Sequence, residues 1–215
     1  YNGPLGKKAY VAYVKLVPLD EADAERPCRR LHGAIDGWTL FHSDEYASRE
    51  HILDIIERYR DSDVGRLLWA FNYGDRTNYP SEKGVFLGGG REVSIEAVPG
   101  ADSYIAGEKV TGESLRDLAD RDLVPQRVVA EHLHAMGVRI DAMFRLAILG
   151  DIPPMPRFKQ KRFLDTHPEF RQVSAQGVPI EKASYAFPEV RAFMVSLVEE
   201  VVRSFDVDGV SLCFM

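Results

Sequence analysis

The clearest hydrophobic pattern in the chain is a helical stripe over residues 188–204. Its apolar residues recur three and four positions apart, as the buried face of a helix requires, and charged residues occupy the other face. Pro188 suits the first helical turn, where its missing N–H costs nothing. The stripe consists of Val190, Phe193, Met194, Leu197, Val198, Val201, Val202 and Phe205. We expect this helix to pack its stripe against the core.

A short apolar segment, 210–215, follows this helix after the polar turn 206–209. No residues typical of a helix N-terminus precede it, and its apolar residues follow one another nearly without interruption. Such a run predicts a strand that is buried on both faces, the kind found in parallel sheets.

The same helix-and-strand unit occurs twice more. A helix from Pro125, ended by Gly137, precedes a predicted strand over 138–144. A helix capped by Ser48 precedes a predicted strand over 65–71, and residues 35–41 predict a further strand ahead of it. From residue 35, strands and helices therefore alternate.

This alternation indicates an α/β fold with right-handed parallel βαβ units. An open doubly wound sheet and a closed barrel both satisfy it. The connections 73–112 and 146–187 are long and follow the carboxyl ends of strands, where the functional loops of barrels lie. We expect these connections to be functional or locally structured.

Composition and charge narrow the classes of function. The chain has 215 residues, of which 45% are hydrophobic and 28% charged, enough for a globular core. Its net charge of −6 argues against a nucleic-acid partner, which favours a basic surface. No apolar run has the roughly 18 residues of a membrane span. Of the two cysteines, Cys28 and Cys213, the second lies in an apolar run and is expected to be a small buried hydrophobe.

The two ends of the chain differ from its middle. Residues 1–30 fit either an edge element or the tail of a preceding domain, so their role is unassigned. The chain begins at Tyr1 rather than Met; if a signal peptide has been removed, a secreted or periplasmic location follows. Because Met215 ends a predicted buried strand, we expect the protein to continue beyond it.

Four segments carry a resemblance to a known family. They are AEHLHAMGVRIDAMF at 130–144, HPEF at 167–170, YAFPEVRAF at 185–193 and FDVDGVSL at 205–212. In order and spacing they resemble the family-10-like glycosyl hydrolases of bacteria. The resemblance implies a (β/α)₈ TIM barrel of glycoside-hydrolase type, with about the first four β/α units in residues 31–215. It also implies a carbohydrate ligand and contact with the remaining half of the barrel.

One departure from that family bears on the activity. Where the family usually has acidic residues at the end of the fourth strand, this chain has Cys213, Phe214 and Met215. Glycosidases need two carboxyl groups beside the scissile bond. The resemblance therefore implies a hydrolase of poly- or oligosaccharides with its main catalytic carboxylates outside this segment. The alternatives are a non-catalytic carbohydrate-binding barrel that has lost the acids, and a barrel enzyme of another class.

Candidate ligand-binding side chains follow the predicted strands. Carboxylates and amides hydrogen-bond sugar hydroxyls, and aromatic rings cover the apolar faces of sugars. Because parallel strands of a barrel direct their carboxyl ends to one face, these side chains are expected to converge. The candidates are His42, Asp44, Asn72, Tyr73, Asp75, Tyr79, Asp141 and Arg145.

Some of these candidates also have a purely structural interpretation. Asn72, Gly74 and Asp75 suit a turn, and Asp44 suits a helix cap. Asp141, inside a strand, is either a polar residue of the barrel interior or a paired structural residue. The pair His167 and Glu169 is expected to form a fixed corner rather than a site.

No metal or cofactor is predicted. His132 and His134 are two positions apart, so they point to different sides of a helix. The glycine run 88–90 lacks the Gly-Lys-Ser/Thr of a phosphate-binding loop. Residues 41–43 contain one histidine, where a metal-dependent barrel hydrolase would show His-x-His.

Overall fold

The computed structural model describes residues 29–37, 41, 48–87, 95–96, 102–149, 157–158 and 163–214. For residues 95–96, 102–106, 108 and 157–158 only the backbone is described. The early segment 1–28 therefore lies outside the described residues, as do His42 and Asp44.

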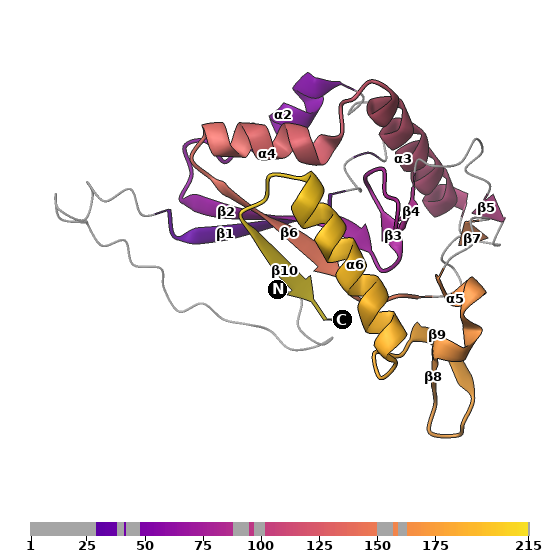
Figure 1. The fold of residues 1–215 in the computed structure, drawn as a ribbon. Helices are drawn as coiled ribbons and strands as arrows, with labels where there is room; N and C mark the ends of the chain where they lie inside the picture. Colours follow the sequence, from indigo (N-terminus) through magenta and orange to yellow (C-terminus); the bar gives the residue numbers. More distant parts are fainter. Residues whose placement is uncertain are drawn as a thin grey trace, which may run out of the picture.

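A parallel sheet forms the centre of the fold (Figure 1). Four strands lie side by side in chain order: β1 (Leu31–Ile35), β2 (Val64–Tyr73), β6 (Arg139–Arg145) and β10 (Gly209–Cys213). Each pairs in parallel with its neighbour. The parallel α/β architecture predicted from the alternation of helices and strands is thus confirmed. Among the described residues the sheet is open, so its closure into a barrel stays a prediction.

The first strand lies earlier than the sequence predicts. Strand β1 pairs Leu31 to Ile35 with β2, whereas the prediction began at residue 35 and ran to Phe41. The chain turns at Gly37, whose φ of +73° lies in the left-handed region. A Cβ at Gly37 would lie 2.4 Å from the carbonyl oxygen of Ala70, so the turn requires glycine. The prediction of a strand over 35–41 was therefore wrong.

Three helices connect the four parallel strands. They are α2 (Arg49–Glu57), α4 (Pro125–Ala135) and α6 (Pro188–Ser204), and α3 (Asp102–Asp120) precedes α4. Each of the three contributes apolar side chains to one core cluster, together with one face of the sheet. That face consists of Leu67, Trp69, Phe71, Ile140, Ala142 and Phe144, all fully buried. The predicted placement of these helices on one side of the sheet is confirmed.

The opposite face of the sheet is more polar and partly exposed. It carries Arg66, Leu68, Met143, Arg145 and Ser211, all half-buried. Successive side chains of a strand point to opposite faces, which places these residues between the buried ones in sequence. We call this surface the uncovered face.

Helix α6 confirms most of the predicted stripe. Val190, Met194, Leu197 and Val201 are buried against the core. Phe193 and Val198 are half-buried and pack on the edge of the cluster. Val202, also assigned to the stripe, is 52% exposed, which corrects that part of the prediction.

Strand β10 differs from the prediction of a strand buried on both faces. Val210 and Leu212 pair with Ala142 and Phe144 of the helix-covered face, yet they are 39% and 49% exposed, since β10 is the last strand of the described sheet. Cys213 is free and half-buried rather than fully buried. The apolar run was correctly assigned to a strand, but its burial was overestimated.

The two long connections contain local structure. After β2 the chain forms the short strands β3 (Arg76–Thr77) and β4 (Val85–Phe86), which extend the sheet beyond the end of β1. Strands β5 (Ile95–Glu96) and β7 (Arg157–Phe158) pair one connection with the other. The second connection also holds α5 (Phe163–Thr166), a 3₁₀ helix (Pro168–Phe170), and the hairpin β8 (Arg171–Val173) and β9 (Pro179–Ala183). No helix among the described residues is long and apolar enough to cross a membrane.

Candidate functional site

Three side chains meet at the carboxyl ends of the parallel strands. Asp36 follows β1, Tyr73 ends β2 and Arg145 ends β6. The Nη2 of Arg145 lies 2.6 Å from the Oδ1 of Asp36, and its Cζ lies 5.6 Å from the centre of the Tyr73 ring. The guanidinium therefore links the ends of three neighbouring strands. We call Asp36, Tyr73 and Arg145 the carboxyl-end cluster.

A register shift in β2 directs Tyr73 to this cluster. The pairing of β2 with β6 shifts between Ala70 and Asn72, after which Asn72 pairs with Phe144 and Tyr73 with Arg145. Because Phe144 belongs to the buried face, Asn72 turns toward the helices and Tyr73 toward the uncovered face. The side chain of Arg76 lies on the same ring, with its Cζ 5.6 Å from the centre.

Asn72 positions the backbone beneath the cluster. Its Oδ1 accepts a hydrogen bond from the N–H of Arg145 at 2.9 Å, and its Nδ2 donates to the carbonyl of Gly74 at 2.7 Å. The same Nδ2 lies 3.2 Å from the carbonyl oxygen of Arg145. The amide is almost fully buried, so these contacts fix the ends of β2 and β6 against each other.

The turn after β2 depends on a glycine. Gly74 has a φ of +64°, and a Cβ there would lie 2.5 Å from the carbonyl oxygen of Ala147. Asp75 follows and is buried, with its Oδ2 accepting the N–H of Phe163 at 2.8 Å. This turn attaches the second long connection to the end of β2.

Tyr79 lies on the helix side of the molecule. Its hydroxyl donates to the Oε2 of Glu200 on α6 at 2.9 Å, and its ring is almost fully buried beside Phe71 and Phe205. Burial, together with the neighbouring carboxylate, raises the pKa of Tyr79 above its ordinary value. The phenol therefore remains protonated and acts as a donor.

Asp141 lies on the uncovered face, nearer the amino ends of the strands. Its Oδ1 pairs with the Nη1 of Arg66 at 2.5 Å. A Cβ on Gly209 of β10 would lie 2.6 Å from the same oxygen, so the neighbouring strand leaves room for the pair. The hydrogen bond to Asp141 raises the pKa of Arg66.

The predicted site residues thus take different positions. Tyr73 and Arg145 lie together, and Asp141 shares their face of the sheet. The buried side chains of Asn72, Asp75 and Tyr79 contact other parts of the chain. Asp36 was missed, because the prediction placed it inside the first strand. The pair Asp36-Gly37 is itself a turn signal and marks the end of that strand.

The histidines of α4 contact two different parts of the fold. His132 lies 2.6 Å from a carboxylate oxygen of Glu57, and His134 lies 2.9 Å from one of Asp208. Over the described residues, no group of three or more His, Cys, Asp or Glu side chains is arranged to hold a metal ion. His167 and Glu169 contact each other at 3.4 Å around the 3₁₀ helix.

Comparisons with known proteins give a distant structural likeness. No family model and no curated protein matches the chain. Among solved structures, the chain is similar to a noncanonic maltogenic α-amylase, AmyB from Thermotoga neapolitana, at 12% identity with a TM-score of 0.45. The similarity covers 87% of this chain and 39% of that one, so the chain spans about two fifths of the amylase's length. At this identity and TM-score, the likeness establishes neither the family nor the activity.

Proposed function

We propose that the chain binds a carbohydrate at the carboxyl-end cluster. The observation that carries the proposal is the meeting of Asp36, Tyr73 and Arg145 at the carboxyl ends of consecutive parallel strands. In open sheets and in barrels built from βαβ units, ligands bind outside these ends. A carboxylate, a guanidinium and a phenol together suit a polyhydroxylated ligand.

The architecture supports a (β/α)₈ barrel of glycoside-hydrolase type, of which this chain holds about four units. Four parallel strands in chain order, with their helices on one side, are what half of such a barrel requires. The segments that resemble the family-10-like glycosyl hydrolases lie mainly on α4 with β6, on the start of α6, and on β10. These segments thus lie in two successive helix–strand units, α4 with β6 and α6 with β10.

The proposed role of this segment is binding rather than bond cleavage. Hydrolysis of a glycoside needs one carboxyl group as acid and a second as nucleophile or base. The carboxyl-end cluster holds one carboxylate, that of Asp36, and it is paired with Arg145. The catalytic acids of a hydrolase would therefore come from outside the described residues. A non-catalytic carbohydrate-binding protein remains the second candidate, favoured by the apolar end of β10.

Calorimetric titration with a panel of gluco-, xylo- and chito-oligosaccharides tests the proposal. We expect one sugar to bind, Tyr73→Ala to weaken it about tenfold, and Tyr73→Phe to retain most of the affinity because the ring supplies the contact. Absence of binding across the panel, or equal affinity in Tyr73→Ala, would refute the proposal.

The same chain should not cleave aryl glycosides. Turnover that disappears in Asp36→Asn or Asp44→Asn would show that this segment holds its own catalytic acid, against the proposed division of roles. Binding without turnover agrees with both candidate functions, and turnover by a longer form of the protein would separate them.

A further inference from the structure

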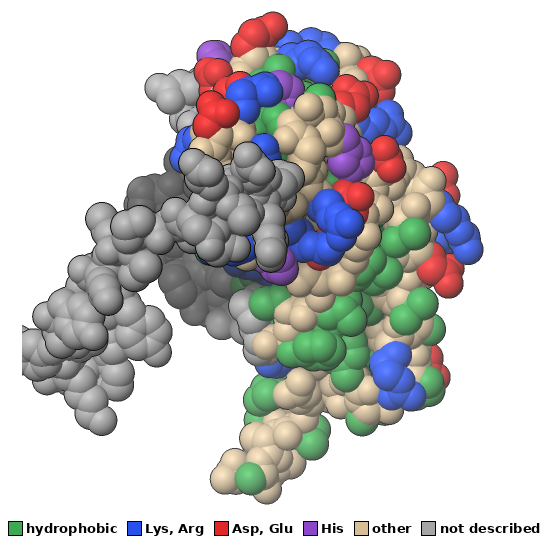
Figure 2. Space-filling model, turned by 90° about the vertical axis from the view of Figure 1, so that its left-hand side faces the viewer, with side chains coloured by type: hydrophobic (Ala, Val, Ile, Leu, Met, Phe, Trp, Pro, Cys, Tyr) green, Lys and Arg blue, Asp and Glu red, His purple; other side chains and the backbone are tan. Residues whose placement is uncertain are grey.

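A second cavity lies at the opposite ends of the same strands. It has a volume of about 570 Å³ and lies where β1 and β2 begin and where α4 leads into β6. It is lined by Arg29, His32, Gly65, Arg66, Met136, Gly137 and Arg139. Figure 2 views this end of the molecule and shows Lys and Arg side chains beside a histidine near its centre. We propose that this cavity binds a phosphorylated small molecule through its phosphoryl group.

The lining is basic. It includes three arginines and a histidine, and none of its residues is acidic. Guanidinium groups bind phosphate oxygens in a bidentate manner, which makes them the preferred partners of phosphate esters. The composition of this wall therefore favours a dianion over a neutral ligand.

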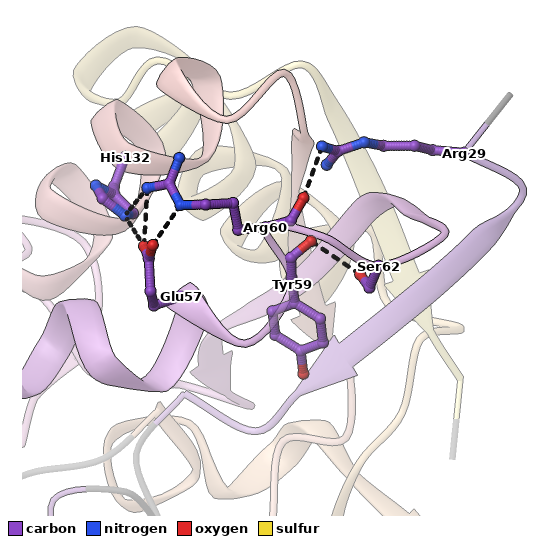
Figure 3. A network of polar contacts seen from close by, with 6 residues as sticks. All are labelled: Arg29, Glu57, Tyr59, Arg60, Ser62 and His132. Carbon is purple, nitrogen blue, oxygen red and sulfur yellow. Dashed lines mark hydrogen bonds and ion pairs between the residues drawn. The ribbon is translucent and has the colours of Figure 1, made fainter. Parts of the chain in front are cut away.

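Two of the three guanidiniums are not neutralised by a carboxylate in the structure. Arg29 donates to the carbonyl oxygen of Arg60 at 2.9 Å (Figure 3). It also donates to the carbonyl oxygen of Val64 at 3.3 Å, and the two contacts orient the group without removing its charge. Arg139 is exposed, and no carboxylate of the described residues lies within ion-pair distance of it. Neither guanidinium is therefore held in an ion pair by the described residues, and both can still bind an anionic group.

The nearby acids have partners of their own. Asp141 pairs with Arg66 at 2.5 Å. Asp208 accepts the N–H of Ile140 at 2.8 Å and contacts His134 at 2.9 Å. Both carboxylates therefore have other hydrogen-bond partners, and Arg139 acts on Asp208 only through its charge.

Glycine shapes the cavity at two points. A Cβ on Gly65 would lie 2.6 Å from the carbonyl oxygen of Arg29, so only glycine allows the two backbones to approach this closely. Gly137 ends α4 at a φ of +70°, and no atom lies within 4 Å of the position of its missing Cβ. The first glycine brings Arg29 to the wall, and the second allows the left-handed turn that leads from α4 toward Arg139.

The volume points to a phosphate ester rather than to a bare ion. Sites for small molecules measure roughly 300–1,000 Å³, a range that includes this cavity. Met136 adds an apolar wall for the organic part of the ligand. The site is separate from the carboxyl-end cluster, because the seven residue steps from Arg66 to Tyr73 span about 23 Å of extended strand.

Calorimetry of the whole chain with AMP, glucose 6-phosphate and glycerol 3-phosphate tests the proposal. We expect at least one ester to bind with a Kd below about 1 mM. Its dephosphorylated form and inorganic phosphate should each bind at least about tenfold more weakly. Affinity should also fall between 50 and 500 mM NaCl, because salt screens the arginines. Failure of all three esters to bind, or equal affinity for the dephosphorylated form or inorganic phosphate, would overturn the proposal.

Arg139→Gln locates the binding. This exposed side chain can be replaced without loss of an ion pair in the described structure, and we expect about tenfold weaker binding of the ester. Arg203→Gln makes the same change in net charge on α6, outside this cavity, and should leave the affinity unchanged. Equal effects of the two variants, or no effect of Arg139→Gln, would contradict the assignment. Circular dichroism of both variants verifies that they are folded.

Discussion

At the scale of single residues, a surface network connects two helices that are far apart in sequence. Glu57 at the end of α2 binds Arg60 in a bidentate manner and lies 2.6 Å from the Nε2 of His132 on α4 (Figure 3). The hydrogen bonds from Arg60 and then from His132 lower the pKa of Glu57 to about 2. The charged carboxylate therefore links α2 to α4.

The network predicts a specific response to acid. The pKa of Glu57 falls from its usual 4.5 to about 2 on folding, so its stabilisation is complete above about pH 4.5 and is lost as the pH falls toward 2. We expect Glu57→Gln to show a smaller loss of Tm between pH 5 and pH 2 than the parent chain. Because the pair is exposed, the difference should be modest.

Thermal melts followed by circular dichroism measure this difference. Glu113→Gln, which removes a carboxylate paired along one helix with Lys109, should follow the parent chain. Identical acid sensitivity of Glu57→Gln and the parent would show that the network does not contribute.

The sequence predicted the directions of some of these side chains but not their partners. The spacing of His132 and His134 correctly indicated that the two side chains point to different sides of the helix. Their partners could not be predicted, because Glu57 lies 75 residues and Asp208 lies 74 residues away. Pairings over such separations follow from the packing of whole elements, which no local pattern contains.

At the scale of helices and strands, the period of the hydrophobic residues predicted which side is buried better than their number did. The stripe of α6 repeats with the helical period, and that period identifies the side that faces the core. In β10 the apolar run carried no such information, since burial depends on which neighbours cover each face. The limits of β1 were likewise set by pairing with β2 and by the turn at Gly37.

Helix α6 allows a direct test of core packing. Leu197 is fully buried, and Leu197→Ala should lower the free energy of unfolding by about 2–5 kcal/mol, because it removes apolar contacts and leaves a cavity. Val195 is 54% exposed on the same helix, and Val195→Ala should cost less than about 0.5 kcal/mol. Urea denaturation gives both values. A cost below about 1 kcal/mol for Leu197→Ala would mean that the stripe is not part of the core.

At the scale of the whole molecule, the order of the four parallel strands followed from the alternation of helices and strands. The structure of the segment between β2 and α3 could not be predicted in this way, because its short strands have no hydrophobic period. Residues 78–82 of that segment contact α4 and α6. Gln126 of α4 donates to the Oδ1 of Asn78 at 2.7 Å, and Asn78 donates to the carbonyl of Ala70 at 2.8 Å. These hydrogen bonds hold Asn78, and the next residue, the candidate ligand-binding Tyr79, therefore lies against α6.

Glu200 connects this segment to α6, and its replacement gives the last prediction. Its carboxylate accepts three hydrogen bonds, from the hydroxyls of Tyr79 and Ser81 at 2.9 and 2.6 Å and from the N–H of Glu82 at 2.7 Å. All three donors come from residues 79–82, so one side chain joins parts of the chain about 120 positions apart. A glutamine offers a single acceptor oxygen in place of two, so its NH₂ group faces at least one of the three donors and that donor loses its partner.

We therefore expect Glu200→Gln to lower the free energy of unfolding by about 1–3 kcal/mol in urea denaturation. Glu199→Gln provides the matched control, because the neighbouring carboxylate has an exposed contact with Arg203 at 3.4 Å and should contribute less than about 0.5 kcal/mol. Tyr79→Phe removes one of the three donors and should cost about 1 kcal/mol, less than the loss of the carboxylate. Equal stability of the Glu199 and Glu200 variants would mean that the 79–82 segment is held by its apolar contacts with Phe71 and Phe205 rather than by the carboxylate.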